Sequence, residues 1–266
     1  YMPVNYFFKW AECGRDLCDH SPTLSTAYFE ASPGTMSKLR SRHIEGWAQL
    51  GRSLYKGTWK SSTLACKFFQ ASPELLENLS FSEMERFAAF LDALSHRSYD
   101  LSAECLTLGQ DIFPLLEERA AFISLANTLV ETGWREVKSF FEAGARSLPR
   151  IDVSQRLRFL KMAEQLVNNG GTNIPGMMLE ISSALAQINT SQHAVILGLG
   201  ESLLPLSTET VPEFIKVVPQ ALEKVTVPQL EKWFAAGVDI LEQNPDGGLA
   251  YFKMESARSE GILETL

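Results

Sequence analysis

Long apolar runs and a net positive charge are both missing from this sequence of 266 residues. No uninterrupted apolar stretch approaches the roughly 20 residues that span a bilayer, and the N-terminus lacks a basic segment followed by an apolar one. The formal net charge is −8, which argues against a nucleic-acid backbone or an anionic membrane as the main partner. We therefore expect a cytoplasmic protein with no nucleic-acid partner and no membrane partner.

Cysteine is also scarce, and the four present are Cys13, Cys18, Cys66 and Cys105. All lie within predicted helices, which favours reduced, buried thiols over a disulfide framework. The nearest approach to a metal cluster is Cys13 and Cys18 beside Asp19 and His20, but structural zinc normally takes a second pair of ligands elsewhere, and none is visible. The sequence thus predicts no metal site and no cofactor.

Histidines and acidic residues at metal-binding spacing are not found either. His43, His96 and His193 lie in separate parts of the chain without an accompanying acid, and we interpret them as surface or cap residues. No set of residues indicates general acid-base or nucleophilic chemistry, so the sequence predicts no catalytic residue and no enzyme.

Strand-like alternation is almost absent, and a longer period dominates the sequence. An aromatic or large aliphatic residue is followed four positions on by a small one, and three positions later by Leu or Ile. The triplets are Trp10/Gly14/Leu17, Trp47/Gly51/Leu54, Phe87/Leu91/Leu94, Phe122/Ala126/Leu129, Phe159/Ala163/Leu166, Ile196/Gly200/Leu203 and Trp233/Gly237/Ile240. A second pair follows each triplet: Phe29 with Leu39, Phe69 with Leu79, Leu106 with Leu116, Phe141 with Ile151, Met178 with Ile188, Ile215 with Val225 and Phe252 with Ile262. Only Leu91 breaks the small-residue rule, and the period of about 37 residues predicts stacked supersecondary units.

Within a unit, the triplet positions fall on one face of a first helix, here called helix A, and the small residue lets a neighbouring helix approach closely. A second helix, helix B, carries the aromatic residue of the second pair. Proline follows that residue by four positions at Pro33, Pro73 and Pro219, so helix B should kink or end there. Ser32 and Ser72 would then cap a short third helix.

These features predict an all-α protein, a right-handed α-helical solenoid of about seven helical hairpins similar to HEAT and armadillo repeats. One domain is expected over residues 1–266, with repeats at about 1–39, 40–79, 80–116, 117–151, 152–188, 189–225 and 226–263. The first repeat opens with Tyr1, Met2, Tyr6, Phe7 and Phe8, so we expect its edge to contact another repeat, another domain or a second copy. The chain is also expected to be part of a longer protein.

The phrase Trp-x-x-x-Gly-x-x-Leu, followed by Ala-Tyr-Phe or Phe-Phe and often by Ala-Ser-Pro, resembles a known bacterial family. It is similar to the helical-repeat region of von Willebrand A-containing partners of MoxR-type AAA+ ATPases, such as nitric-oxide-reductase and Rubisco activation proteins. Trp10 to Pro33, Trp47 to Pro73 and Trp233 to Ser256 carry the resemblance, which implies a scaffold that assembles or recognises a target for an ATPase. The family's Asp-x-Ser-x-Ser metal loop has no match, because Asp152-Val153-Ser154-Gln155-Arg156 lacks the final serine and falls where a helix cap is required.

The predicted binding residues lie one position after, or two before, the helix-B aromatic position. These positions are three apart and share one helical face, so stacking the units would align them in what we call the helix-B ladder. Its predicted binding residues are Glu30, Lys67, Gln70, Glu104, Glu142, Glu213, Lys216 and Lys253. Acidic residues gather toward Glu104 and Glu142 and basic ones toward Lys216 and Lys253, so a partner of complementary asymmetry would be steered in register. The alternative is the ordinary solvated face of an amphipathic helix.

Three functions remain open. The first is a non-enzymatic protein-binding scaffold, an adaptor for a protein partner such as a MoxR-type AAA+ ATPase or its target. The second is a nucleic-acid-acting enzyme of the helical-repeat DNA glycosylase type, which requires a basic groove and a base-flipping pocket that the net charge disfavours. The third is a passive structural spacer between domains, whose surface would carry no patterned chemistry.

Overall fold

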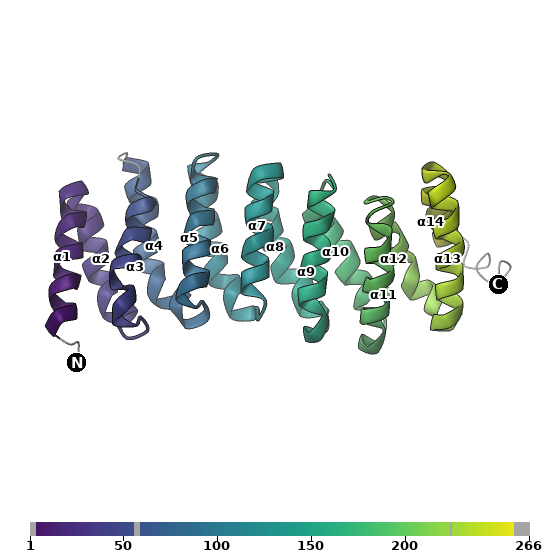
Figure 1. The fold of residues 1–266 in the computed structure, drawn as a ribbon, viewed down its shortest axis with the longest axis horizontal. Helices are drawn as coiled ribbons and strands as arrows, with labels where there is room; N and C mark the ends of the chain where they lie inside the picture. Colours follow the sequence, from purple (N-terminus) through teal and green to yellow (C-terminus); the bar gives the residue numbers. More distant parts are fainter. Residues whose placement is uncertain (1–3, 56–58, 224, 258–266) are drawn as a thin grey trace. The chain divides into compact units, whose positions relative to one another are not determined.

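The computed structural model describes residues 4–55, 59–223 and 225–257. Within this part of the chain every element is a helix and no strand forms, so the all-α class predicted from the sequence is confirmed (Figure 1). The chain divides into two compact units, residues 1–141 and 142–266. The expected single domain and its repeat boundaries stay predictions.

The first unit contains α1 (Val4–His20), α2 (Pro22–Met36), α3 (Ile44–Ser53), α4 (Trp59–Asn78), α5 (Phe81–Ser95), α6 (Tyr99–Ile112), α7 (Arg119–Gly133) and the start of α8 (Val137–Ser147). The second contains the rest of α8, then α9 (Val153–Asn168), α10 (Ile174–Leu185), α11 (Thr190–Leu203), α12 (Thr210–Leu222), α13 (Val227–Gln243) and α14 (Pro245–Ala257). Short 3-10 turns, η1 (Ser41–His43), η2 (Phe113–Leu115), η3 (Trp134–Glu136) and η4 (Leu148–Arg150), join or extend the longer helices.

Each unit is built of two layers of helices. In the first unit α1, α3, α5 and α7 pack side by side, and α2, α4 and α6 form a second layer that packs on the first (Figure 1). In the second unit α9, α11 and α13 form one layer, and α10, α12 and α14 form the other. Consecutive helices pair as hairpins, α1 with α2, α3 with α4 and α5 with α6 in one unit, and α9 with α10, α11 with α12 and α13 with α14 in the other. The odd-numbered helices are thus the predicted A helices, and the even-numbered ones are the B helices.

The same aromatic contact recurs inside the hairpins of both units. The ring on helix A meets the ring on helix B edge to face, at centroid distances of 5.0 Å for Trp10/Phe29, 5.1 Å for Trp47/Phe69, 5.1 Å for Phe122/Phe141 and 5.3 Å for Trp233/Phe252. The interplanar angles lie between 81° and 89°. Such edge-to-face pairs add about 0.5–1.5 kcal/mol beyond the burial of their area. The pairs occupy the first triplet position and the helix-B aromatic position, so the sequence period corresponds to a repeated contact.

Small residues on helix A make room for the helix-B ring. A Cβ atom on Gly14, Gly51 or Gly237 would overlap the ring tip of the phenylalanine in its own hairpin. At Gly200 a Cβ would lie 3.1 Å from Cδ1 of Ile215, the aliphatic residue at the same register. The predicted close approach at these four glycines is confirmed.

The hairpin of α5 and α6 explains the one exception to the small-residue rule. Leu91 occupies the small position on α5, and the glycine lies instead on the partner helix, at Gly109. A Cβ on Gly109 would lie 2.6 Å from Cζ of Phe87 and 3.0 Å from Cε2 of Phe113. Here helix A supplies the ring and helix B supplies the glycine that makes room for it. The same ring-on-glycine contact, called the interlock below, is thus built with the roles of the two helices exchanged.

The prolines do not start a third helix, which corrects a prediction. Pro33 lies inside α2, Pro73 inside α4 and Pro219 inside α12. Each lies close to the C-terminal end of its helix. A proline there removes one backbone hydrogen bond, but few helical residues follow it that could be disturbed. A single helix therefore continues past each proline.

Ser32 and Ser72 are not helix caps but hydrogen-bond partners of two indoles, the half-buried one of Trp10 and the buried one of Trp47. Ser32 Oγ accepts a hydrogen bond from Trp10 Nε1 at 2.8 Å, and Ser72 Oγ accepts one from Trp47 Nε1 at 2.9 Å. Each hydroxyl in turn donates to the carbonyl four residues earlier in its own helix. The serine of the repeated Ala-Ser-Pro phrase thus provides the hydrogen-bond acceptor for the tryptophan of helix A in both hairpins.

Three further expectations are tested at single side chains. Asp152 is the N-cap of α9, accepting a hydrogen bond from the Ser154 amide at 3.0 Å, which confirms the cap interpretation.

His193 is not a surface or cap residue, because it is 1% exposed and lies between two backbone groups. The Asp152 amide donates to His193 Nδ1 at 3.3 Å, which leaves Nε2 to donate to the Leu185 carbonyl at 2.9 Å. The expectation of buried thiols holds for Cys105 alone, since Cys18 is exposed and Cys13 and Cys66 are partly exposed.

Candidate functional site

The predicted ladder residues lie on the solvent side of the B helices. The exposed ones are Glu30 on α2, Lys67 and Gln70 on α4, Glu104 on α6, Glu142 on α8 and Lys216 on α12, and Glu213 on α12 is half-exposed. The side chain of Lys253, on α14, lies outside the described residues. Glu142 belongs to the second unit, so its alignment with Glu104 stays a prediction.

An open groove of about 470 Å³ runs between α4 and α6 in the first unit and brings two predicted residues together. Lys67 lines it from α4, and Glu104 lines it from α6. The remaining lining residues are Thr63, Tyr99, Asp100, Ala103 and Thr107. One lysine faces two carboxylates there, so the groove has an acidic balance.

A second open groove, of about 440 Å³, lies in the other unit between α10 and α12. Lys216 is the predicted residue that lines it, together with Arg150 of η4 and Glu180 of α10. Leu179, Ser183, Ala184 and Gln187 complete the lining. Two cations face one carboxylate, so this groove has a basic balance.

Ion pairs between neighbouring B helices fix some of the charges in both grooves. Lys138 Nζ on α8 lies 2.9 Å from Glu104 Oε2, and Lys216 Nζ on α12 lies 2.9 Å from Glu180 Oε2. The hydrogen bond to Glu180 raises the pKa of Lys216 above its ordinary value, with a further contribution from Glu213 at 3.4 Å. All of these side chains are partly exposed, so the pairs orient the charges more than they stabilise the fold.

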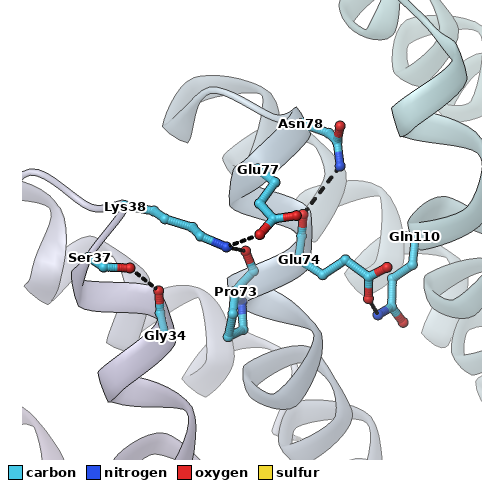
Figure 2. Close-up of polar contacts among 8 residues, drawn as sticks. All are labelled: Gly34, Ser37, Lys38, Pro73, Glu74, Glu77, Asn78 and Gln110. Atoms are coloured by element: carbon cyan, nitrogen blue, oxygen red, sulfur yellow. Dashed lines mark hydrogen bonds and ion pairs between the residues drawn. The ribbon is translucent and has the colours of Figure 1, made fainter.

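A polar cluster at the C-terminal part of α4 joins three consecutive B-helix segments of the first unit (Figure 2). Lys38, which follows α2, donates from Nζ to the Pro73 carbonyl at 2.7 Å and pairs with Glu77 at 2.5 Å. On the other side of α4, Gln110 Nε2 of α6 donates to Glu74 Oε2 at 2.5 Å. These side chains restrain α2, α4 and α6 beside the groove, so that its lining residues sit on connected helices.

Several groove residues were not among those predicted from the sequence. Asp100 and Thr63 lie four positions before Glu104 and Lys67, so they share a helical face with them, and that spacing could have revealed both. Glu180 is one position outside the ladder and enters the groove through its pair with Lys216. Arg150 comes from η4, the 3-10 turn that follows α8, and the spacing of the ladder residues gives no signal for it.

Among the described residues, no group of three His, Cys, Asp or Glu side chains is placed to hold a metal ion. Burial raises the pKa of the Cys105 thiol to about 12, which suppresses its reactive thiolate form. The described helices include none that is both long and apolar enough to cross a membrane.

Comparison with known proteins gives no match: no protein-family model, no curated protein and no solved structure is similar enough to this chain to be matched.

Proposed function

We propose that the chain is a non-enzymatic protein-binding scaffold that holds its partner along the outer face of the B helices. The observation that carries this proposal is the pair of grooves at the ladder register, one in each unit, whose lining side chains have opposite excess charge before the ion pairs with Lys138 and Glu213, which lie outside the linings, are counted. Both grooves are open and lined by apolar as well as charged and polar side chains, as suits an extended or helical segment of another protein. Helical repeats of this kind commonly use such surfaces to bind proteins.

The charges indicate what the bound segment carries. The α4–α6 groove offers Asp100 and Glu104 against Lys67, so a segment with lysine or arginine is complementary to it. The α10–α12 groove offers Arg150 and Lys216 against Glu180, so an acidic segment is complementary there. A partner with basic and acidic segments in the corresponding order gains orientation and association rate more than raw affinity.

The proposal includes the architecture of a right-handed solenoid with seven hairpin repeats in one domain. Its support is the edge-to-face aromatic pair that recurs at one register in the hairpins of both units. Within each unit the A helices and the B helices form separate layers, as stacked hairpins require. The sequence resemblance adds a MoxR-type AAA+ ATPase, or its target, as the proposed partner. The proposal also keeps the cytoplasmic location expected from the lack of long apolar runs in the sequence.

Site-specific photo-crosslinking in the producing cells tests the surface. A photoreactive residue replaces Thr107, which is exposed and lines the α4–α6 groove, and in a matched chain it replaces Glu85, which is exposed on helix A. We expect a discrete protein adduct from position 107 and none from position 85. The adduct should weaken when Asp100 and Glu104 are both reversed to lysine, because the complementary charge is lost.

Outcomes that contradict the proposal are equally specific. A protein adduct only from position 85 would place the binding surface on the A helices. Nucleic acid recovered with position 107 would favour the helical-repeat enzyme, and two positions that both fail to crosslink would favour the passive spacer. The identity of a recovered protein then decides whether an AAA+ ATPase is the partner.

A further inference from the structure

His193 joins three segments of the second unit from a buried position. The ring belongs to α11 and is 1% exposed. Its Nδ1 accepts a hydrogen bond from the amide of Asp152, the N-cap of α9, at 3.3 Å. Its Nε2 donates to the carbonyl of Leu185, the last residue of α10, at 2.9 Å. One side chain therefore ties the start of α9 to the end of α10.

The position of His193 in the repeat carries other kinds of side chain elsewhere in the chain. It lies three residues before the first residue of the triplet, and three hairpins have a buried apolar residue there: Ile44, Met84 and Leu230. Two hairpins have an arginine that donates from Nε to a carbonyl ahead of its own helix: Arg119 and Arg156. None of these side chains changes its charge near neutral pH, whereas histidine is the residue type that does so. Packing at this position therefore does not require a histidine.

Both hydrogen bonds of the His193 ring require its neutral form. A second proton on Nδ1 would point an N–H at the Asp152 amide, which is also a donor, so that bond would be lost. The Asp152 carboxylate now accepts from the Ser154 amide at 3.0 Å and from the Ser154 hydroxyl. Those hydrogen bonds lower the pKa of Asp152, and the charge of the nearby His193 ring contributes a smaller lowering. An imidazolium at position 193 would therefore be attracted to this carboxylate.

Other charged groups are less suited to attract the ring. Those on the elements that meet at it are Arg150 of η4, Arg156, Arg158, Lys161 and Glu164 of α9, Glu180 of α10 and Glu201 of α11. Glu180 and Glu201 each form an ion pair with a cation on a neighbouring helix. Glu164 lies about three helical turns beyond the start of α9. Asp152 is thus the carboxylate to which a protonated ring would turn.

We propose that His193 is a proton-operated latch that sets the position of Arg150 in the α10–α12 groove. The neutral ring holds the Asp152 amide, and η4, which carries Arg150, lies directly before that residue. When Nδ1 takes up a proton from solvent, the ring releases the amide, and the Asp152 carboxylate leaves Ser154 to accept from the ring. The turn η4 and the first turn of α9 then loosen, and Arg150 loses its fixed position.

The latch regulates the groove because Arg150 is one of the two cations in its lining. Binding of an acidic segment should weaken as the pH falls, since only Lys216 then stays in place against it. This consequence rests on the proposed function of the groove. The latch itself does not, because its parts all lie within the chain.

NMR of the whole chain tests the latch without any partner. We expect Nε2 alone to carry a proton at about pH 8 and both ring nitrogens to carry one at about pH 5. Hydrogen-exchange protection, corrected for the intrinsic rate, should fall roughly tenfold at both the Asp152 and Ser154 amides over this range, as expected for the loss of one buried hydrogen bond each. A fall at Asp152 alone would overturn the exchange of partners, and unchanged protection of both amides would overturn the latch.

Two substitutions of His193 remove the titrating group. His193→Gln keeps an amide that can donate to Leu185, and His193→Met uses the side chain of Met84 at the same register, in case the first variant disturbs the fold. Protection of the Ser154 amide should no longer depend on pH in either variant. His96→Gln, a change of an exposed histidine, is the matched control and should keep the response of the parent chain. A response that persists without His193 would assign it to another group and overturn the proposal.

Photo-crosslinking separates the latch from the groove. A photoreactive residue replaces Ser183, which is exposed and lines the α10–α12 groove, in lysate of the producing cells at both pH values. We expect a weaker protein adduct at the lower pH in the parent chain and equal adducts in His193→Gln. Equal adducts in the parent chain would overturn the regulation of the groove. If no adduct forms at either pH while the NMR response is present, the proposed function fails and the latch stands.

Discussion

Gly51 gives the sharpest test of the interlock between helix A and helix B. An added Cβ at this position would overlap the tip of the Phe69 ring, with Cε1 and Cε2 both at 2.5 Å, and the ring is fully buried against Trp47. In a free helix Gly→Ala stabilises by about 1 kcal/mol, whereas overpacking a core costs roughly 1–3 kcal/mol. We expect Gly51→Ala to lower the free energy of unfolding by about 1–2 kcal/mol, because three ring atoms must move together.

The assay is urea denaturation monitored by circular dichroism. The dependence of the unfolding free energy on urea concentration must be the same in every variant, so that a shift in the midpoint reports a change in stability. Gln49→Ala, an exposed change on the same helix, serves as the control and should stay within about 0.5 kcal/mol of the parent chain. Shortening the opposing ring should relieve the overlap, so Gly51→Ala combined with Phe69→Leu should show a favourable coupling of about 1 kcal/mol.

Two results would refute this reasoning about Gly51. Stabilisation by Gly51→Ala of the size expected from helix propensity would mean that the ring does not fill the space above the glycine. Strict additivity with Phe69→Leu would mean that the two positions do not share that space, even if each single change destabilises.

Other positions supply independent predictions. Ser72→Ala should destabilise by about 1–3 kcal/mol in the same denaturation assay, because it leaves the buried Trp47 indole without an acceptor, and Ser32→Ala should cost less because Trp10 is half-buried; equal costs would contradict this account. Hydrogen bonds from the Ser154 side chain and amide hold the pKa of Asp152 below its ordinary value of 3.8. The folded state therefore gains stability from this carboxylate above that pH and loses it as the pH falls, so Asp152→Asn should flatten the acid limb of stability measured between pH 5 and pH 2. Native protein at pH 8 should react with a thiol reagent at exposed Cys18 and not at Cys105, whose pKa burial raises to about 12; modification of Cys105 before unfolding would show that this part of the core opens.

The sequence was most informative where one physical requirement recurs. A glycine three positions before the last residue of the apolar triplet, with a phenylalanine on the next helix, signals the same contact at Gly14, Gly51 and Gly237, so the helical class and these close contacts could be predicted directly. The end of helix B could not be predicted from the sequence. A proline near a helix terminus destabilises the helix only slightly, so packing against neighbouring helices is enough to continue it past Pro33 and Pro73.

The candidate site was only partly predictable. Helical spacing identified the exposed face that holds Lys67 and Glu104, but pairing across helices depends on the separation of α6 from α8 and of α10 from α12. For that reason Lys138 and Glu180 were missed, although they set the charge environment of the grooves. His193 shows the same limit, since its two backbone partners come from segments 8 and 41 residues away in the chain.

The exchanged interlock of α5 and α6 matters for anyone who would recombine or redesign these hairpins. The same contact is built in two ways in the chain. In the α3–α4 hairpin the glycine is Gly51 on α3 and the ring is Phe69 on α4, whereas in the α5–α6 hairpin the ring is Phe87 on α5 and the glycine is Gly109 on α6. A consensus averaged over the hairpins would mix them and place either two rings or two glycines across the same gap, the first a clash and the second a void. Whole hairpins are therefore the smallest exchangeable pieces, and a helix transplanted without its mate should fail even where every single residue is a common one at its position.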